Sequence, residues 1–394
     1  MARLTAENIN SIPIGPLGII GMPGCEELTD KIDKYLVKWR KTQAHEHAET
    51  IAFYGYQRDT YKINISVPRF GSGEGKGVIE ETVRGYDIYI IADVFNYSCT
   101  YNMYGMTVPK SPDDHFADLK RVIHALSSKP KRVSVIMPML YEGRQHKRSS
   151  RESLDCAMAL QELVDLGVDN IITFDAHDQR VQNSIPDESF ENVMPTYQMI
   201  KAVVNNVEDI KIDKDHLMII SPDEGAMQRC IYFATQLGVN LGMFYKRRDY
   251  TRVINGRNPI VEHQYLGDSV KNKDIIIVDD MISSGESMLE VASKLKNLGC
   301  NRIFVCTTFG LFCNGLEVFD KAYEDGIFYR VFTTNGVYQT PELLNREWYV
   351  SVELSKYTAY FIDTLNHDMS VSLLLDSSEK IKNLLKTKGL KEGE

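Results

Sequence analysis

The sequence predicts an α/β protein whose sheets are mainly parallel, and one repeated pattern is the main reason. Residues 275–278 form a short, apolar, mostly β-branched run that stops at Asp279 and Asp280. Such a run is typical of a strand buried on both faces of a parallel sheet. Apolar residues at helical spacing then follow, and Gly299 stops the pattern. The order of strand, polar turn and helix recurs at residues 217–237, as expected of alternating strands and helices.

The other predicted elements follow the same two periodicities. Short β-branched runs predict strands, and apolar residues three and four positions apart predict helices. In chain order, the predicted strands are 17–24, 63–70, 87–94, 132–137, 170–174, 240–245, 302–307, 327–332 and 348–354, and the predicted helices are 25–40, 113–127, 154–166, 314–323, 357–363 and 371–385. A length of 394 residues favours two domains, and the Pro-, Asn- and acid-rich stretch 183–196 is the predicted junction.

Composition and charge exclude several classes of protein. The chain is 43% hydrophobic and 25% charged, as globular proteins are, and its net charge of −9 argues against nucleic acid or an anionic membrane as the main partner. No apolar run approaches the roughly 18 residues that a spanning helix needs, and the N-terminus lacks the apolar core of a signal peptide. The seven cysteines are scattered without a CxxC pair, which favours reduced thiols. We therefore expect a cytoplasmic protein.

The stretch 279–287 has the residues of a ligand site. Parallel strands place their carboxyl ends at the crevice where ligands bind, and the start of the following helix offers N–H groups and a positive dipole end to phosphate. Carboxylates such as Asp279 and Asp280 accept hydrogen bonds from a sugar diol, or hold a magnesium ion that arrives with the ligand. An acidic strand end in an ordinary βαβ unit has the same outline, so other segments must decide.

Two further segments are candidates for phosphate or nucleotide contacts. The glycine-rich run 71–77 does not match a P-loop, because Phe70 stands where the first glycine is needed and Gly77 stands where a Ser or Thr must follow the lysine. A hairpin tip is the alternative interpretation. The basic loop 143–151 is either a solvated surface or, in an acidic chain, a polyphosphate contact.

Three more turns carry polar residues where a ligand site is expected. His177 lies just past a predicted strand and between acids, which makes it a candidate for metal binding or proton transfer, although a single histidine is more often a packed or capping residue. Asp223 lies at the tip of another strand-to-helix turn. Lys246 and Arg248 lead into the polar stretch 249–263, for which we predict a long mobile loop.

Residues 279–287 resemble the phosphoribosyl-binding loop of the phosphoribosyltransferase fold. That loop typically has an apolar strand, two acids, two apolar residues, then Asp-Thr, Gly and Thr. The chain departs from the pattern at four positions: Ser283 replaces the aspartate, Ser284 and Ser287 replace threonines, and Glu286 stands where a glycine is usual.

From about residue 17 onward, the whole chain resembles the ribose-phosphate pyrophosphokinases. The segments that match, in the order of that family, are 70–74, 81–85, Arg144-Gln145, 171–177, 221–223, Lys246 with Arg248, 279–287, 308–312 and 334–335. His146 stands where the family has an aspartate, and Ser72 stands where it has an asparagine.

The resemblance implies a fold and a reaction. It implies two tandem phosphoribosyltransferase-like domains, each a mainly parallel sheet flanked by helices. Residues 1–190, joined by 351–394, would form the ATP side, and residues 191–350 would form the ribose 5-phosphate side. The implied reaction uses magnesium and transfers the pyrophosphoryl group of ATP to the 1-hydroxyl of ribose 5-phosphate, with release of AMP, for nucleotide biosynthesis.

The same resemblance implies roles for individual residues and a homo-oligomer built from dimers, up to a hexamer. The expected residues are Lys246 and Arg248 for catalysis; Phe70, Ser72, Glu74, Arg144 and Gln145 for ATP; Asp279, Asp280, Ser283, Ser284, Gly285, Glu286 and Ser287 for ribose 5-phosphate; and His177 and Asp223 for Mg²⁺.

Two other functions stay open. A phosphoribosyltransferase would use the same loop for an activated sugar, but it would need one such domain and would have no use for the segments that match the ATP side. A catalytically silent, regulatory relative would bind both ligands without turnover. Activity is favoured by the retained motif residues, and the silent alternative is kept open by the departures at Ser72, His146, Ser283 and Glu286.

Overall fold

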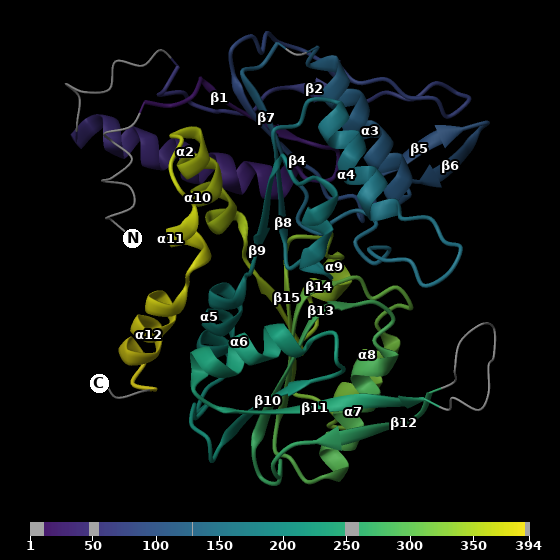
Figure 1. Cartoon of the computed structure of the whole chain (residues 1–394), viewed down its shortest axis with the longest axis vertical. Helices are drawn as coiled ribbons and strands as arrows, with labels where there is room; N and C mark the ends of the chain where they lie inside the picture. The colour runs from purple at the N-terminus through teal and green to yellow at the C-terminus, as the bar shows by residue number, and fades with distance from the viewer. Residues whose placement is uncertain (1–11, 47–54, 128, 249–259, 391–394) are drawn as a thin grey trace. The chain divides into compact units, whose positions relative to one another are not determined.

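A computed structural model describes residues 12–46, 55–127, 129–248 and 260–390, which form two compact units (Figure 1). Unit 1 comprises Met1–Met194, Gly336–Tyr338 and Glu353–Asp376, and unit 2 comprises Pro195–Asn335, Gln339–Val352 and Ser377–Glu394. The sequence assigned all of 351–394 to the first domain. In the structure the last described helix, Ser378–Thr387, belongs to unit 2, because its buried Ile381 and Leu385 pack into the core of that unit.

Unit 1 is built on a parallel sheet. In spatial order its strands are β1 (Leu17–Gly21), β4 (Asp87–Ile91), β7 (Arg132–Ile136), β8 (Asn170–Phe174) and β9 (Ser189–Val193), and each neighbouring pair is parallel. β4 and β8 are buried along their whole length, which explains why their sequences are largely apolar rather than alternating. β9 lies in the stretch that the sequence assigned to the junction, since a half-buried edge strand needs no apolar run.

Helices and two small hairpins complete unit 1. The helices are α2 (Glu26–Glu46), α3 (Pro112–Ala125), α4 (Asp155–Asp165), the 3₁₀ helix η2 (Gln179–Ser184), α10 (Ser355–Asn366) and α11 (Ser372–Leu375), and the antiparallel hairpins are β2 (Ile65–Ser66) with β3 (Val78–Ile79) and β5 (Thr100–Met103) with β6 (Met106–Pro109). α3 begins where its sequence predicts, because Ser111 and Asp114 form a capping box around Pro112. The strand predicted at 63–70 is reduced to the two residues of β2.

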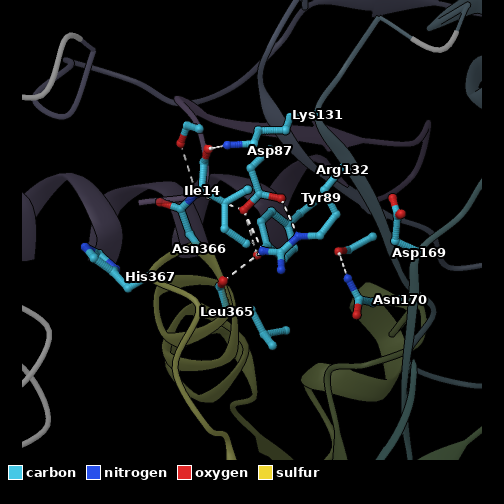
Figure 2. Close-up of polar contacts among 12 residues, drawn as sticks. Ile14, Asp87, Tyr89, Lys131, Arg132, Asp169, Asn170, Leu365, Asn366 and His367 are labelled. Atoms are coloured by element: carbon cyan, nitrogen blue, oxygen red, sulfur yellow. Dashed lines mark hydrogen bonds and ion pairs between the residues drawn. The ribbon is translucent and has the colours of Figure 1, made fainter. Parts of the chain in front are cut away.

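A buried polar network fastens α10 to the amino ends of the strands of unit 1 (Figure 2). Asp87, the first residue of β4, accepts two hydrogen bonds of 2.8 Å from the guanidinium of Arg132, the first residue of β7. Asn366 at the end of α10 donates to the same carboxylate at 2.8 Å, and Arg132 also donates to the Leu365 carbonyl at 2.8 Å. Asp87 is fully buried, at 0% exposure, and a buried charge is stable only when it is paired in this way.

Unit 2 is built on a larger sheet. In spatial order its strands are β12 (Ile260–Leu266), β11 (Asn240–Arg248), β10 (Leu217–Ser221), β13 (Asp274–Ile282), β14 (Ile303–Gly310), β15 (Arg330–Thr334) and β16 (Tyr349–Val352). β11 and β12 are antiparallel, and the other neighbouring pairs are parallel. Of the loop predicted at 249–263, residues 260–263 therefore lie in a strand, and residues 249–259 lie outside the described residues.

Helices cover both faces of the unit 2 sheet. They are α5 (Thr196–Asn206), α6 (Met227–Leu237), α7 (Glu286–Asn297), α8 (Glu317–Glu324), α9 (Pro341–Leu344) and α12 (Ser378–Thr387). Alternate residues of β13 enter two separate cores: Ile276 packs in the cluster that holds α5, α6 and α12, and Ile277 packs in the cluster that holds α7 and α8. Each such side chain contributes about 1.5–3 kcal/mol by burial. The predicted α/β fold with helix-flanked parallel sheets is confirmed.

Candidate functional site

The acid pair lies near the carboxyl end of β13, the central strand of unit 2. Asp280 is buried at 3% exposure, and the side chain of Asp279 is 22% exposed. The sequence predicted that the strand ends at these two acids, and this boundary was wrong. The backbone of β13 stays in register with β14 as far as Ile282, which lies opposite Gly310. The strand is longer because pairing with a neighbour, rather than its own apolar run, decides where it ends.

A tight turn joins β13 to helix α7. Gly285 has a φ of 87°, and a Cβ atom at this position would lie 2.3 Å from the ring of Phe319. Any other residue would strain the backbone and collide with that ring. The turn is also fastened to the chain beyond β14, because the Cys313 amide donates to the Ser283 carbonyl at 2.9 Å. The predicted phosphate-binding turn is therefore held in a fixed conformation before any ligand arrives.

The first turn of α7 follows directly at Glu286. Its N-cap residue is Gly285, which has no side chain with which to cap this end of the helix. The orphan N–H groups and the positive dipole end of such a helix attract anions. Ser284 is half-buried and Ser287 is exposed, so both hydroxyls lie at or near the surface of the turn. Exposed Glu286 stabilises the helix through its dipole, but its carboxylate would repel a phosphate at the same place.

Asp223 and Arg229 accompany the acid pair. Asp223 lies in the turn after β10, where its Oδ1 atom accepts hydrogen bonds from two backbone amides at 2.9 and 3.3 Å. Arg229 lies in the first turn of α6, and its Nη1 atom is 3.5 Å from Asp279 Oδ1. Burial raises the pKa of Asp279 well above its ordinary value, Asp280 and Asp223 raise it further, and Arg229 opposes the shift.

The sequence analysis missed Arg229. Its contact with Asp279 depends on how α6 packs beside the sheet, so the sequence around Arg229 carries no local signal of it. Among the predicted ribose 5-phosphate residues, the structure brings together Asp279 and Asp280 at the end of β13, and the other five residues occupy the adjoining turn and helix start.

The glycine-rich tip in unit 1 forms a closed turn beyond the hairpin of β2 and β3. Phe70 is 56% exposed, its amide donates to the Glu74 carbonyl at 2.7 Å, and Ser72 Oγ donates to the Glu74 carboxylate at 2.8 Å. Arg69 fixes the tip from behind, because it donates to the Gly73 carbonyl at 3.1 Å and to the buried carboxylate of Asp118 at 2.9 Å. The three residues predicted for ATP thus share one anchored turn with an exposed aromatic ring.

The basic loop brings a second histidine next to His177. His146 Nε2 is 3.2 Å from Asp178 Oδ2, and the ring of His146 lies 5.4 Å from the ring of His177. Burial lowers the pKa of His146. Arg144 is exposed, and Gln145 Nε2 donates to the Ser153 carbonyl at 2.9 Å. The sequence analysis treated His146 only as a departure from the family, and its proximity to His177 is a tertiary fact.

The predicted catalytic residues Lys246 and Arg248 lie at the end of β11, where the backbone of Lys246 pairs with His263 in β12. Their side chains lie outside the described part of the chain. Within that part, no group of three or more His, Cys, Asp or Glu side chains has the arrangement of a metal site. None of the described helices is both long and apolar enough to cross a membrane.

The fold and the site define the class of protein. A helix-flanked parallel sheet whose central strand carries two acids near its carboxyl end, followed by a glycine turn at a helix start, is typical of a phosphoribosyltransferase-type domain. In agreement with this, residues 192–343 match the phosphoribosyl transferase domain, and residues 17–167 match the N-terminal domain of ribose phosphate pyrophosphokinase. The chain belongs to the ribose-phosphate pyrophosphokinase family of enzymes, as its sequence motifs predicted.

Individual relatives agree with this assignment. The chain is 26% identical over 318 residues to a ribose-phosphate pyrophosphokinase from Vibrio cholerae, and the matched region covers 79% of this chain and 91% of the relative. It is 28% identical over 316 residues to the enzyme of the same name from Shewanella oneidensis, and the matched region covers 78% of this chain and 89% of that relative. The crystal structure of phosphoribosylpyrophosphate synthetase from Mycobacterium smegmatis has the same fold, with a TM-score of 0.68 at 19% identity over 89% of this chain and 99% of that one.

Proposed function

We propose that the protein transfers the pyrophosphoryl group of ATP to the 1-hydroxyl of ribose 5-phosphate and so supplies 5-phosphoribosyl 1-pyrophosphate for nucleotide biosynthesis. The sugar oxygen attacks the β-phosphorus, the bond to the α-phosphate oxygen breaks, AMP leaves, and the hydroxyl proton is released. The observation that carries the proposal is the acid pair of β13, joined through a turn to a helix start whose N-cap residue is Gly285 and makes no side-chain cap. One strand end thus offers acceptors for a sugar and donors for its phosphate.

Each residue of that strand end has a proposed role toward ribose 5-phosphate. Asp279 and Asp280 would accept hydrogen bonds from the ribose hydroxyls, because a carboxylate is an acceptor only and a diol offers two donors. The hydroxyls of Ser283, Ser284 and Ser287 and the first amides of α7, around Gly285 and Glu286, would hold the 5-phosphate. Alignment of the 1-hydroxyl is the main contribution that a protein makes to this class of reaction.

The nucleotide would bind to unit 1. The exposed ring of Phe70 offers a face on which adenine can stack, and Ser72 and Glu74 lie on the same turn. Arg144, as an exposed guanidinium, would pair with the polyphosphate, and Gln145 would contact it from the same loop. Lys246 and Arg248 would neutralise the charge that develops on the transferring group, which typically contributes about 3 kcal/mol for each contact.

We propose Mg²⁺ as the cofactor, carried by the nucleotide. Magnesium is usually held by one or two carboxylates together with substrate phosphates rather than by a cage of protein ligands. The side chain proposed to contact the ion is His177 in unit 1 and Asp223 in unit 2. When bound, the ion would offset the charge of the phosphate oxygens.

The remaining proposals concern the setting of the enzyme. A cytoplasmic location is supported by the cysteines, all seven of which are described and none of which is in a disulfide. We propose a homo-oligomer based on dimers, up to a hexamer, by analogy with the family. Nucleic acid is not a proposed partner, because the net charge is −9.

The test is to incubate the purified chain with ATP, Mg²⁺ and ribose 5-phosphate and to identify the products by phosphorus NMR. We expect AMP and 5-phosphoribosyl 1-pyrophosphate in equal amounts, with neither formed when one substrate is left out. ADP with a singly phosphorylated sugar would indicate an ordinary kinase. Consumption of added 5-phosphoribosyl 1-pyrophosphate with a nucleobase would indicate a phosphoribosyltransferase. Binding of both ligands without turnover would indicate the silent, regulatory relative.

A further inference from the structure

We propose that Arg229 is a positioning residue for sugar binding, which holds the Asp279 carboxylate in the orientation that receives the ribose hydroxyls. The inference rests on the proposed function, and it adds a residue that the sequence motifs did not contain. Arg229 is placed for this role by the fold, because α6 follows the turn after β10, and β10 is the neighbour of β13 in the sheet.

One ion pair and one hydrogen bond meet at the same oxygen atom of Asp279. Nη1 of Arg229 lies 3.5 Å from Asp279 Oδ1, and the backbone amide of Asp280 donates to the same Oδ1 atom at 2.9 Å. A carboxylate that is engaged at one oxygen from two directions has little freedom to rotate. The arrangement therefore fixes the plane of the acid before a sugar binds, which is how a preorganised site lowers the cost of binding.

The surroundings make this contact necessary. Asp280 and Asp223 both act on Asp279 as like charges, and burial removes the water that would otherwise screen them. Two neighbouring carboxylates that are not compensated repel each other or share a proton, and either change removes an acceptor that the sugar needs. The side chain of Arg229 is itself only 9% exposed, so its charge acts at short range with little screening by solvent.

The same strand offers a matched control. Arg302 pairs with Asp274 at the amino end of β13, with Nη2 2.6 Å from Asp274 Oδ2. This pair also joins an arginine to a mostly buried acid of β13, but it lies at the end of the strand where no ligand residue is predicted. Loss of Arg302 should therefore report the structural cost of breaking an Arg–Asp pair on this strand.

The experiment is calorimetric titration of the full chain with ribose 5-phosphate and, separately, with Mg²⁺-ATP. For Arg229→Gln we expect the dissociation constant of ribose 5-phosphate to rise about tenfold, because the Asp279 carboxylate loses the ion pair that orients it. Binding of ATP should be unchanged. Arg302→Gln should leave both constants unchanged while it lowers the melting temperature. In an Asp279→Asn background, Arg229→Gln should cost little, since the charge that it serves is gone.

Arg229→Lys separates positioning from charge alone. A lysine keeps the charge but lacks the rigid fork of donors, so sugar binding should recover in part and stay weaker than in the wild type. If Arg229→Gln does not fold, as judged by circular dichroism, Arg229→Lys alone decides, and wild-type binding of the sugar by that variant would overturn the inference.

Three further outcomes would overturn the inference. Arg229→Gln could bind the sugar as tightly as Arg302→Gln does, it could lose ATP and ribose 5-phosphate equally, or it could cost as much in the Asp279→Asn background as in the wild type. Turnover of the wild type by phosphorus NMR keeps the two proposals distinguishable. A wild type that binds the sugar without turnover would overturn the proposed function alone, and a wild type that does not bind it would overturn both.

Discussion

The two ends of strand β13 carry the same residue type in opposite circumstances. At the amino end, Asp274 accepts hydrogen bonds from Arg302 Nη2 at 2.6 Å and from Asn301 Nδ2 at 2.8 Å. At the carboxyl end, Asp279 has Arg229 at 3.5 Å and is surrounded by the like charges of Asp280 and Asp223. The first acid is satisfied by the fold itself. The second is held at a cost in free energy, which is the pattern expected where a ligand completes the site.

The largest expected effect concerns the glycines at the two ends of α7. Gly285, beside the carboxyl end of β13, has a φ of 87°, and a Cβ atom added there would lie 2.3 Å from the ring of Phe319. Gly299 has a φ of 86°, but a Cβ atom added there would lie 3.6 Å from its nearest neighbour. Gly285→Ala should lower the free energy of unfolding by about 3–5 kcal/mol, because strain and collision add. Gly299→Ala should lower it by only about 1–2 kcal/mol from the backbone alone. Urea unfolding of both variants measures the difference, and equal losses would show that the turn at Gly285 adapts.

The second prediction breaks the structural end of the strand. Asp274→Asn should lower the free energy of unfolding by about 1–3 kcal/mol, because Arg302 loses its charged partner on β13 and keeps only Asp209, whose Oδ1 is 3.0 Å from Arg302 Nη1. Binding of ribose 5-phosphate to the folded variant should be unchanged. Thermal unfolding and calorimetry check the two parts separately. Weakened sugar binding would show that the two ends of β13 are not independent.

The third prediction concerns the carboxyl end of β13, where replacing an acid should raise the free energy of unfolding instead of lowering it. Because burial and like charges raise the pKa of Asp279, ionisation of this acid opposes folding. Asp279→Asn should therefore be as stable as the wild type or more stable at neutral pH, by about 0.5–2 kcal/mol.

The pH dependence of that difference follows from the direction of the shift. Below the ordinary aspartate pKa of about 3.9 the acid is protonated in both folded and unfolded states, so wild type and variant should be equally stable. As pH rises toward the raised pKa of the folded state, only the unfolded state loses its proton, and the wild type loses stability relative to Asp279→Asn. Unfolding titrations between about pH 4 and about pH 8 measure this trend. A gap that shrinks as pH rises would contradict it.

The amount of structure that the sequence could predict differs between these regions for a physical reason. The presence and order of the strand, turn and helix from Ile275 to Gly299 were predictable because each has a local signal: an apolar run, small residues, and a glycine stop. The end of β13 at Ile282 was not predictable, because it depends on pairing with β14. β12 was missed for the same reason, since its sequence, with Glu262, His263 and Gln264 in the middle, has no continuous apolar run and forms a strand beside β11.

The site shows the same division. Asp279, Asp280 and Gly285 were predictable because they form one contiguous motif. Arg229 was not, because it meets Asp279 only through the packing of α6 against the sheet. His146 likewise stood out only as a substitution, and its contact with Asp178 requires the loop to fold back onto the turn after β8. Contacts between segments that are distant in sequence have no local signal.

The smallest expected effect concerns Glu286. Its carboxylate at the start of α7 favours the helix dipole, so Glu286→Gln should lower the free energy of unfolding by about 0.5 kcal/mol. The same change removes a negative charge from the proposed phosphate site and should tighten binding of ribose 5-phosphate by about two- to fivefold. Glu290→Gln, one turn later on the helix, is the control and should leave sugar binding unchanged. Weaker sugar binding by Glu286→Gln would contradict a phosphate at this helix start.

The most direct test of the central claim is calorimetric titration of Asp280→Asn with ribose 5-phosphate and with Mg²⁺-ATP. The claim is that the carboxyl end of β13 binds the sugar. Loss of one charged acceptor should raise the dissociation constant of ribose 5-phosphate by about 10- to 100-fold and leave that of ATP nearly unchanged. Equal losses for both ligands, or wild-type affinity for the sugar, would contradict the claim.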